Sequence, residues 1–246
     1  GDVYKRQVYK GVYATDEDVP VNPLTGERLR MGGNTSTQAY FKAGDPIWVD
    51  VNGDYIIDEK DKVIVGNSQP RMTGGISINL RYKAFSINTN CSFTLRRDII
   101  NKALADRFRA YGTPVAGKVN LTGSGALTPI EAYNFWTEDN IYAQYPNPFD
   151  YTRSSIIQPF RYDQTLFMED GSYFKINGIS VAYTIPKKML DFFRISRCQL
   201  NFSMNNIYTF SKYSGINPEN VNNLGYDTSG GYPNGRTVTF GVSMDF

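Results

Sequence analysis

Cys198-Gln199-Leu200-Asn201-Phe202-Ser203-Met204-Asn205-Asn206-Ile207-Tyr208 is the stretch that decides the fold, because apolar and polar residues alternate along it. A period of two places the apolar side chains on one face of a β-strand and the polar side chains on the other. The last residues, 237–246, repeat the alternation. Both stretches therefore predict strands with one apolar and one polar face.

Three further segments alternate clearly and one alternates weakly. The clear segments are 74–82, 85–95 and 172–185, and the weak one is 4–13. The chain also holds 18 Tyr and 15 Phe but only 2 Trp, and Tyr and Phe favour strands over helices. We therefore expect an all-β fold.

The connections between these strands fall into two kinds. Long loops are expected at about 14–73, 97–171 and 210–236, and short ones near 83 and at 186–196. Transmembrane β-barrels combine short periplasmic turns with long extracellular loops, whereas a soluble β-sandwich, whose inner faces also alternate, changes strand about every 8–12 residues. The pattern predicts an antiparallel transmembrane β-barrel segment with long extracellular loops. About five to six strands cannot close a barrel of that size, so the barrel is incomplete.

Composition excludes several classes of function. The chain has no His, which removes the commonest general base and metal ligand, so we do not expect an enzyme. The net charge is only +2 and no run is rich in Lys and Arg, so we do not expect a nucleic-acid-binding protein. Cys91 and Cys198 occupy apolar strand positions and are interpreted as small hydrophobic residues. Apolar runs are far shorter than the ~20 residues of a transmembrane helix, so any membrane span must be a strand.

An acidic loop at 50–61 has the spacing of an EF-hand calcium loop, with oxygen-bearing side chains at its first, third, fifth, ninth and twelfth positions. Tyr55 stands where such loops have Gly, and the last position carries Asp in place of the longer Glu. The alternative is a turn that satisfies its own backbone through Asx hydrogen bonds and needs no ion. The candidate Ca²⁺ ligands are Asp50, Asn52, Asp54, Ile56 (through its carbonyl), Asp58 and Asp61.

Aromatic residues gather both in the loops and near the strand ends. The loop aromatics could stack on sugar rings or plug a lumen, but packing anchors within the loops are the favoured interpretation. Those near strand ends are expected to form girdles at the membrane interfaces. The loop set is Trp48, Phe135, Trp136, Tyr142, Tyr145, Phe149 and Tyr151, and the girdle set is Tyr82, Phe85, Tyr173, Tyr183, Tyr208 and Phe210.

Five blocks, in this order, carry a resemblance to a known family. They are Gly44-Asp45 leading into "WVDVNGDYIIDEKD", then "VIVGNSQPRMTGGISINLRYKAFSIN", "MEDGSYFKINGISVAYTIPKKML", "RCQLNFSMNNIYTFSKYSGINPE" and "GGYPNGRTVTFGVSMDF". The chain resembles the C-terminal barrel region of SusC/RagA-type TonB-linked outer-membrane transporters over nearly all of its length. The resemblance implies that residues 1–246 are a fragment of the barrel, and that the plug domain and the signal peptide lie outside it.

The resemblance also implies a function and partners. It implies nutrient uptake across the outer membrane of a Gram-negative bacterium, namely import of oligosaccharides or peptides with a SusD-like surface lipoprotein and with energy delivered by TonB to a missing N-terminal region. The C-terminal alternation of Phe240, Val242, Met244 and Phe246 resembles the signal read by the barrel-assembly machinery. The residues expected to line the lumen are Asn88, Asn201, Ser203 and Asn205, and those expected to face lipid are Leu200, Phe202, Phe240 and Val242.

A second interpretation, from another class of protein, is a secreted or surface β-sandwich. In that case the acidic loop would bind calcium and the loop aromatics would bind glycan. The two hypotheses differ in what they require of the strands, because a sandwich buries one face of each sheet against a second sheet. A barrel wall instead presents its apolar face to lipid.

Overall fold

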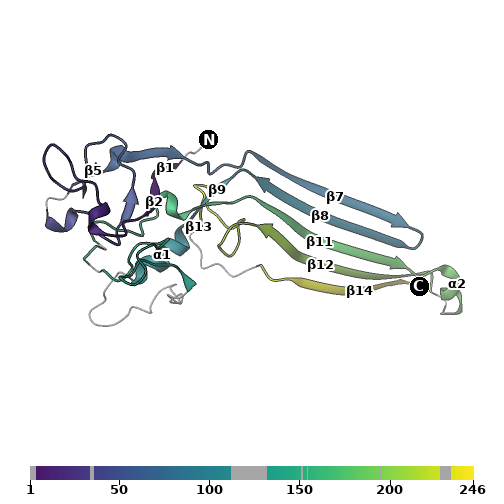
Figure 1. The fold of residues 1–246 in the computed structure, drawn as a ribbon. Coiled ribbons are helices and arrows are strands. Elements are labelled where there is room, and N and C mark those ends of the chain that lie inside the picture. The colour runs from purple at the N-terminus through teal and green to yellow at the C-terminus, as the bar shows by residue number, and fades with distance from the viewer. Residues whose placement is uncertain are drawn as a thin grey trace. The chain divides into compact units, whose positions relative to one another are not determined.

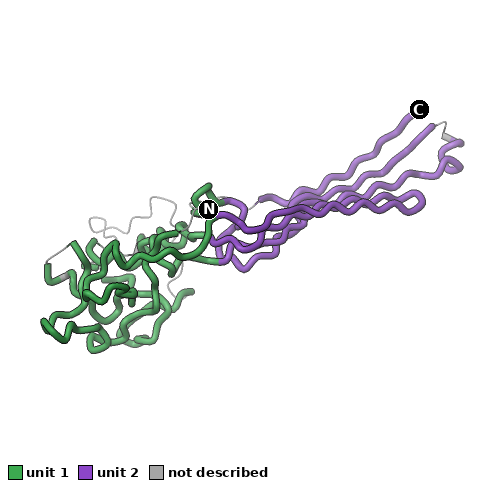
Figure 2. Tube along the Cα trace, turned by 90° about the horizontal axis from the view of Figure 1, so that it is seen from above, with its two compact units in different colours: residues 1–68, 99–169, 221–230 green, residues 69–98, 170–220, 231–246 purple. Residues whose placement is uncertain are grey.

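The computed structural model describes residues 4–33, 36–111, 132–150, 152–153, 155–193, 195–227 and 234–246. Tyr151 of the loop aromatics lies outside the described residues. The chain divides into two compact units (Figure 2). Unit 1 comprises 1–68, 99–169 and 221–230, and unit 2 comprises 69–98, 170–220 and 231–246.

Unit 2 is a five-stranded antiparallel sheet in which neighbours in sequence are neighbours in space (Figure 1). The strand order is β14-β12-β11-β8-β7. The five strong strand predictions are confirmed, with ends that differ by a few residues. The strands are β7 (Met72–Tyr82), β8 (Phe85–Leu95), β11 (Tyr173–Thr184), β12 (Arg197–Ser211) and β14 (Thr237–Asp245).

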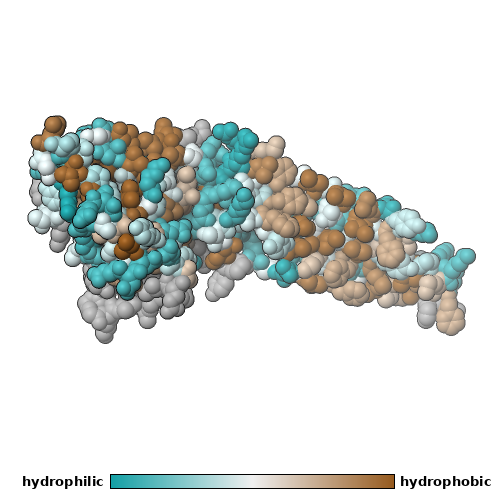
Figure 3. Space-filling model, in the orientation of Figure 1, coloured by the Kyte–Doolittle hydropathy of each residue, from teal (hydrophilic) through white to brown (hydrophobic). Residues whose placement is uncertain are grey.

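The register of this sheet aligns the alternation of all five strands. One row across the sheet reads Leu80, Ile87, Val181, Phe202 and Phe240. The adjacent row reads Asn79, Asn88, Ser180, Ser203 and Thr239. Because successive residues of a strand point to opposite faces, the sheet has an apolar face, defined by the first row and its equivalents, and a polar face, defined by the second. Figure 3 shows apolar side chains gathered over the strands of unit 2.

A β-bulge at Asn177 keeps the apolar face continuous along β11. Ile176 pairs with Cys91, while Gly178 pairs with Asn90, so Asn177 is an extra residue relative to β8. A bulge residue shifts the period-two phase by one. Phe174 and Ile176 therefore lie on the same face as Ile179, although their spacing in the sequence places them on opposite faces.

The long connections all leave the same end of the sheet. The strands β8 and β11 meet there with Thr94 opposite Tyr173, and β12 ends there with Ser211 opposite Tyr173. The other end holds the tight turn after β7, in which Lys83 has a φ of 51°, and the connection between β11 and β12. That second connection contains the short helix α2 (Lys187–Leu190).

The described part of unit 1 is built from short strands, 3-10 helices at Asp16–Asp18, Thr37–Ala39, Glu59–Asp61 and Thr165–Phe167, and the α-helix α1 (Lys102–Tyr111), which the sequence did not predict. Its sheets pair β1 with β6, β2 with β4 and β3 with β5, and place β9 between β10 and β13. The weak strand prediction over 4–13 is confirmed in part, because the structure has two short strands there, β1 and β2, and both belong to these small sheets rather than to the five-stranded sheet. The strands are β1 (Tyr4–Gln7), β2 (Tyr9–Val12), β3 (Arg30–Met31), β4 (Pro46–Trp48), β5 (Ile56–Ile57), β6 (Lys62–Val65), β9 (Asp98–Asn101), β10 (Met168–Asp170) and β13 (Tyr226–Asp227).

The stretches outside the wall strands have hydrophobic cores of their own. The first core surrounds Phe41, Trp48 and Ile57 and includes Ile157 from a distant part of the sequence. The second surrounds Phe108. Among the described residues, no helix combines the length and the apolar composition needed to span a bilayer.

Candidate functional site

The polar face of the unit 2 sheet brings the four predicted lumen residues together. Asn88 and Ser203 lie opposite Ser180 on its two neighbouring strands. The Asn88 side-chain amide donates a hydrogen bond to the Ser180 hydroxyl over 3.5 Å. Asn205 lies opposite Gly178, where an added Cβ would come within 2.8 Å of the Asn205 side-chain oxygen. Asn201 completes the set on β12. The four residues share one face, as the alternation predicts, and that face is rich in amide and hydroxyl groups.

The apolar face has exposed residues on every strand of the sheet, and they are densest on the edge strands β7 and β14. The exposed fraction is 40% for Phe202, 58% for Leu80 and 68% for Phe240. Val242 and Met244 continue this face along β14, opposite Leu200 and Cys198 respectively. Phe246 follows β14 and is 88% exposed. The residues of the expected assembly signal thus alternate along the edge strand of the sheet, and recognition by the assembly machinery stays a prediction.

Aromatic side chains lie near both ends of the apolar face. Phe85 and Tyr183 stack with their ring centroids 4.6 Å apart at the short-turn end. Tyr208 and Phe210 lie 4.6 Å apart at the end from which the long connections leave. Tyr173 was also expected in a girdle, but it pairs with Thr94 and so lies on the polar face. The bulge at Asn177 causes this error, and Phe174 takes the position on the apolar face, with its ring centroid 6.3 Å from that of Phe210.

The acidic loop folds as a turn held by its own side chains. The two Asp50 carboxylate oxygens accept hydrogen bonds from the backbone N–H groups of Gly53 and Tyr55, each over 2.8 Å. Asp61, which is fully buried, accepts from the N–H groups of Val51 and Asp58. Tyr55 has a φ of 61°, the left-handed conformation for which calcium loops use Gly. Tyr55 therefore departs from the EF-hand pattern in its side chain but follows the pattern in its backbone conformation.

The side chains of Asp54, Asn52 and Asp58 also accept hydrogen bonds from backbone N–H groups of this turn, rather than gathering around one ion site. Asp54 accepts from the Ile56 N–H, Asn52 from the Asp54 N–H and Asp58 from the Lys60 N–H. Within the described ranges, no three His, Cys, Asp or Glu side chains gather closely enough to hold a metal ion. The geometry agrees with the Asx-bonded alternative, and calcium binding through these residues and the Ile56 carbonyl stays a prediction.

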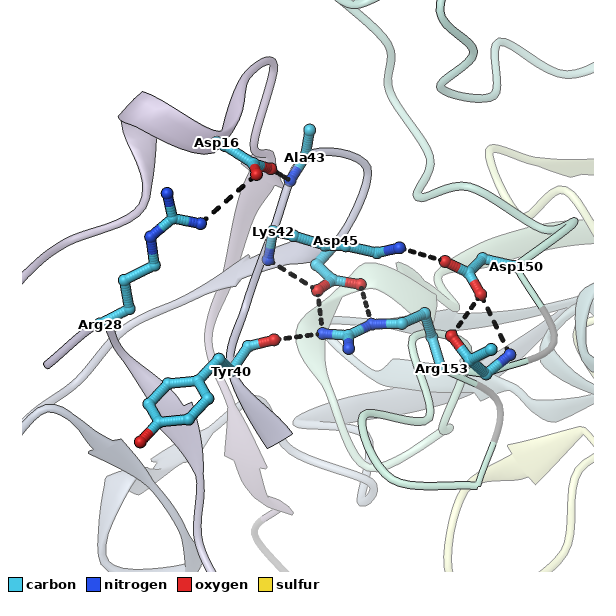
Figure 4. Close-up of polar contacts among 9 residues, drawn as sticks. Asp16, Arg28, Tyr40, Lys42, Ala43, Asp45, Asp150 and Arg153 are labelled. Atoms are coloured by element: carbon cyan, nitrogen blue, oxygen red, sulfur yellow. Dashed lines mark hydrogen bonds and ion pairs between the residues drawn. The ribbon is translucent and has the colours of Figure 1, made fainter. Parts of the chain in front are cut away.

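A buried ion pair between Asp45 and Arg153 fixes the centre of unit 1 (Figure 4). Arg153 Nε donates to Asp45 Oδ1 over 3.0 Å, and Nη2 donates to the other carboxylate oxygen and to the Tyr40 carbonyl. Burial raises the pKa of Asp45, and the guanidinium opposes that rise. This pair could not be predicted from local sequence patterns, because its members lie 108 positions apart.

Two further carboxylates surround this pair (Figure 4). Asp16 accepts from the Ala43 N–H over 2.8 Å and pairs with Arg28 at 3.4 Å, and the backbone hydrogen bond lowers the pKa of Asp16. Asp150 pairs with Lys42 Nζ at 2.5 Å. Burial acts to raise the pKa of Asp150, but its hydrogen bonds outweigh that effect and lower the pKa. These contacts join stretches that are distant in sequence into one body.

Three of the loop aromatics, Trp48, Phe135 and Tyr145, pack into the cores, whereas Phe149 is 42% exposed. Phe135 and Tyr145 contact Phe108 with centroid distances of 4.9 and 5.0 Å. Trp136 is 9% exposed and donates from Nε1 to the Ala14 carbonyl. Tyr142, at 84% exposed, remains outside. The favoured interpretation of loop-packing anchors fits Phe135, Trp136 and Tyr145.

Comparison with known sequences finds several similar receptors. The chain is 29% identical over 253 residues to the TonB-dependent receptor P3 of Formosa agariphila, covering 97% of this chain and 21% of that protein. It is 23% identical over 241 residues to the TonB-dependent receptor SusC of Bacteroides thetaiotaomicron, covering 90% and 21%. No family model matches the chain. The chain thus spans about a fifth of the length of the curated relatives it matches.

Comparison with solved structures gives the same assignment of fold. The RagAB peptide transporter superimposes with a TM-score of 0.66 at 17% identity, over 99% of this chain and 22% of that one. The RagAB peptide importer in the open-open state gives a TM-score of 0.60 at 17% identity, over 98% and 22%. The sequence and structure matches together confirm the resemblance to SusC/RagA-type TonB-dependent receptors and the all-β, antiparallel barrel-segment fold. The relatives named here are receptors and transporters rather than enzymes.

Proposed function

We propose that this chain is the C-terminal wall of a TonB-dependent outer-membrane transporter that imports oligosaccharides or peptides together with a SusD-like lipoprotein. The observation that carries the proposal is the exposed apolar face of the unit 2 sheet, backed by a polar face of amides and hydroxyls. In water such a face costs about 25 cal/mol per Å² relative to an apolar environment. In a bilayer it meets hydrocarbon, and the polar face then borders a hydrated lumen.

The strand lengths fit a bilayer. The five wall strands have 11, 11, 12, 15 and 9 residues, and a tilted transmembrane strand needs about 9–11. Aromatic pairs near both ends of the apolar face match the girdles of such barrels. The sheet has open edges at β7 and β14, which supports further strands of a longer protein continuing the wall on either side.

The connections define the sidedness of the proposed wall. Outer-membrane barrels have long extracellular loops and short periplasmic turns. The end of the sheet that carries the long connections, and therefore unit 1, is assigned to the cell exterior. The turn after β7, the connection that contains α2, and Asp245 at the end of β14 are assigned to the periplasm. Contacts with the lipoprotein then fall to unit 1, and TonB acts on the part of the receptor that lies outside this chain.

The sandwich hypothesis fits the exposure of the strands poorly. The inner face of a β-sandwich is buried by a second sheet, but Leu80, Phe202 and Phe240 are 40–68% exposed. The buried clusters of the described residues belong to unit 1. The names of the similar proteins further support the transporter, since RagAB is described as a peptide transporter and the sequence relatives are named TonB-dependent receptors.

The proposal is tested on the full-length protein in its native cells. Membrane fractionation should recover it in the outer membrane, and gel mobility should shift on heating, because folded barrels resist unfolding in detergent. Growth on a panel of oligosaccharides and peptides should depend on both the receptor gene and TonB. Recovery in the soluble fraction without a heat shift would reject the transporter and favour the secreted sandwich.

A further inference from the structure

A cavity of about 440 Å³ opens in unit 1 beside the acidic loop. Pockets that hold small ligands measure about 300–1,000 Å³ and combine apolar walls with a few polar groups. All of the residues that line this cavity belong to unit 1. Its lining includes Leu29, Ile47, Trp48, Tyr55, Asp18 and Asp50.

The apolar walls of this cavity are rigid. Trp48 and Leu29 are each 2% exposed and belong to the first hydrophobic core, against which Tyr55 and Ile47 pack. The Trp48 indole donates a hydrogen bond to Gln164 over 2.8 Å. Tyr55 is held by its left-handed backbone and by the hydrogen bond of its N–H to Asp50. A ligand therefore meets the half-buried side chains of Ile47 and Tyr55, which are supported by their packing against the core that contains Trp48 and Leu29.

The charge of the lining is negative only. Asp18 and Asp50 are the charged residues of the lining, and no Lys or Arg is among its members. Within the described part of the chain, neither carboxylate forms an ion pair. Burial raises the pKa of the Tyr13 hydroxyl, also in the lining, to about 12, and the nearby Asp45 and Asp50 add to that rise. Negative charge that lacks a cationic partner thus borders an apolar cavity.

We infer that this cavity binds a cationic group carried on an apolar stem, as in the lysine or arginine side chain of a peptide. The methylene stem would lie on Ile47 and the Tyr55 ring, and the charged end would reach Asp18 and Asp50. A sugar would need many convergent hydrogen-bonding groups, and the lining is mainly apolar. The inference rests on the proposed function and deepens it, because it selects peptides with basic residues among the proposed substrates.

The test measures binding to the purified full-length protein in detergent, after calcium has been removed with a chelator. The probes are dye-labelled Gly-Lys-Gly, Gly-Arg-Gly, Gly-norleucine-Gly and maltotriose. Norleucine keeps the apolar stem of lysine without its ammonium group. We expect the lysine and arginine probes to bind at least about tenfold more tightly than the norleucine probe, and their affinity to fall as salt screens the carboxylates.

Three variants locate the binding. One carboxylate oxygen of Asp18 accepts hydrogen bonds from the N–H and the hydroxyl of Thr15. Asp18→Asn keeps an oxygen that can accept these bonds but removes the negative charge, and should weaken binding of the lysine probe about threefold to fivefold. Tyr55→Gly removes one wall but fits the backbone φ of 61°, and should weaken the probe about fivefold. Glu17→Gln is the control, since it changes the same charge on the neighbouring residue, which is exposed and outside the cavity. It should leave binding unchanged.

Equal binding of the lysine and norleucine probes, or tight binding of maltotriose that Tyr55→Gly abolishes, would overturn the inference. So would a lysine preference that Asp18→Asn and Glu17→Gln reduce equally, or no binding of any probe. These results leave the membrane assignment intact, because fractionation and heat-modified mobility report on it separately. A lysine preference lost in Asp18→Asn and Tyr55→Gly, but kept in Glu17→Gln, is the result that supports the cavity.

Discussion

Replacing Met204 by lysine should prevent stable assembly of the full-length protein in the membrane, whereas Ser203→Lys should be tolerated. Met204 lies on the apolar face and Ser203 lies next to it on the polar face of the same strand. At about 3.3 Å per residue and a tilt of about 40°, Met204 lies about 10 Å in height from Leu200, which shares a row with the Phe85–Tyr183 aromatic pair, and so lies near the middle of an apolar band about 25 Å tall. The pair therefore tests which face meets lipid at one depth.

The expected cost follows from that depth. A lysine on the lipid face near the bilayer midplane destabilises a barrel by about 2–4 kcal/mol, which corresponds to roughly 30-fold to 800-fold in the folding equilibrium. Lysine on a hydrated face carries no comparable cost. The assay compares the heat-shifted, folded fraction of each variant in outer-membrane preparations, with total protein as the reference. Equal loss in both variants, or a loss confined to Ser203→Lys, would refute the assignment of the two faces.

Three further predictions concern unit 1 and the bulge. Tyr55→Ala should leave the acidic loop about 1 kcal/mol less stable than Tyr55→Gly, because both variants lose the packing of Tyr55 against the first core but only glycine adopts a φ of 61° without steric cost, and faster cleavage of this loop in Tyr55→Ala than in Tyr55→Gly would show it in limited proteolysis. Arg153→Ala should destabilise unit 1 by about 3–5 kcal/mol, because it leaves the Asp45 carboxylate buried and without its cationic partner. Burial already raises the pKa of Asp45, so Asp45 should become protonated as the pH is lowered from neutrality, and the loss of stability relative to the native protein should shrink. Proteolysis over a series of urea concentrations at several pH values measures this loss. Gly178→Ala should cost about 1–3 kcal/mol, because its Cβ would meet the Asn205 side-chain oxygen at 2.8 Å and the Met204 carbonyl oxygen at 3.2 Å; an unchanged folded fraction in the gel assay would contradict this.

The sequence allowed the wall to be predicted because its information is local. Alternation places Leu200, Phe202 and Phe240 on one face without knowledge of the partner strands. The bulge at Asn177 could not be predicted in this way, because one extra residue reverses the phase of β11 and moved Tyr173 to the unexpected face. The Asn177-Gly178 dipeptide, which breaks the strand pattern, was the available signal.

The strands and cores of unit 1 could not be predicted from the sequence, for a different physical reason. Its strands have 2 to 4 residues, which is too short for a period to emerge. Its stability comes from contacts between distant segments, such as the Asp45–Arg153 pair and the packing of Ile157 on the core around Phe41. The acidic loop was recognised from spacing alone, but only the structure shows that Asp50 and Asp61 serve the backbone of the turn.

The interleaved composition of unit 1 restricts how such receptors can recombine. Its residues come from three separate stretches, 1–68, 99–169 and 221–230. The first core joins Phe41 to Ile157, and β13 pairs with β9 across a long interval of sequence. A chimera that exchanged only one stretch between two relatives would combine core residues from different proteins, which no longer pack together. New specificity is therefore expected to spread by substitution at exposed positions, or by exchange of all three stretches together, rather than by grafting of single loops.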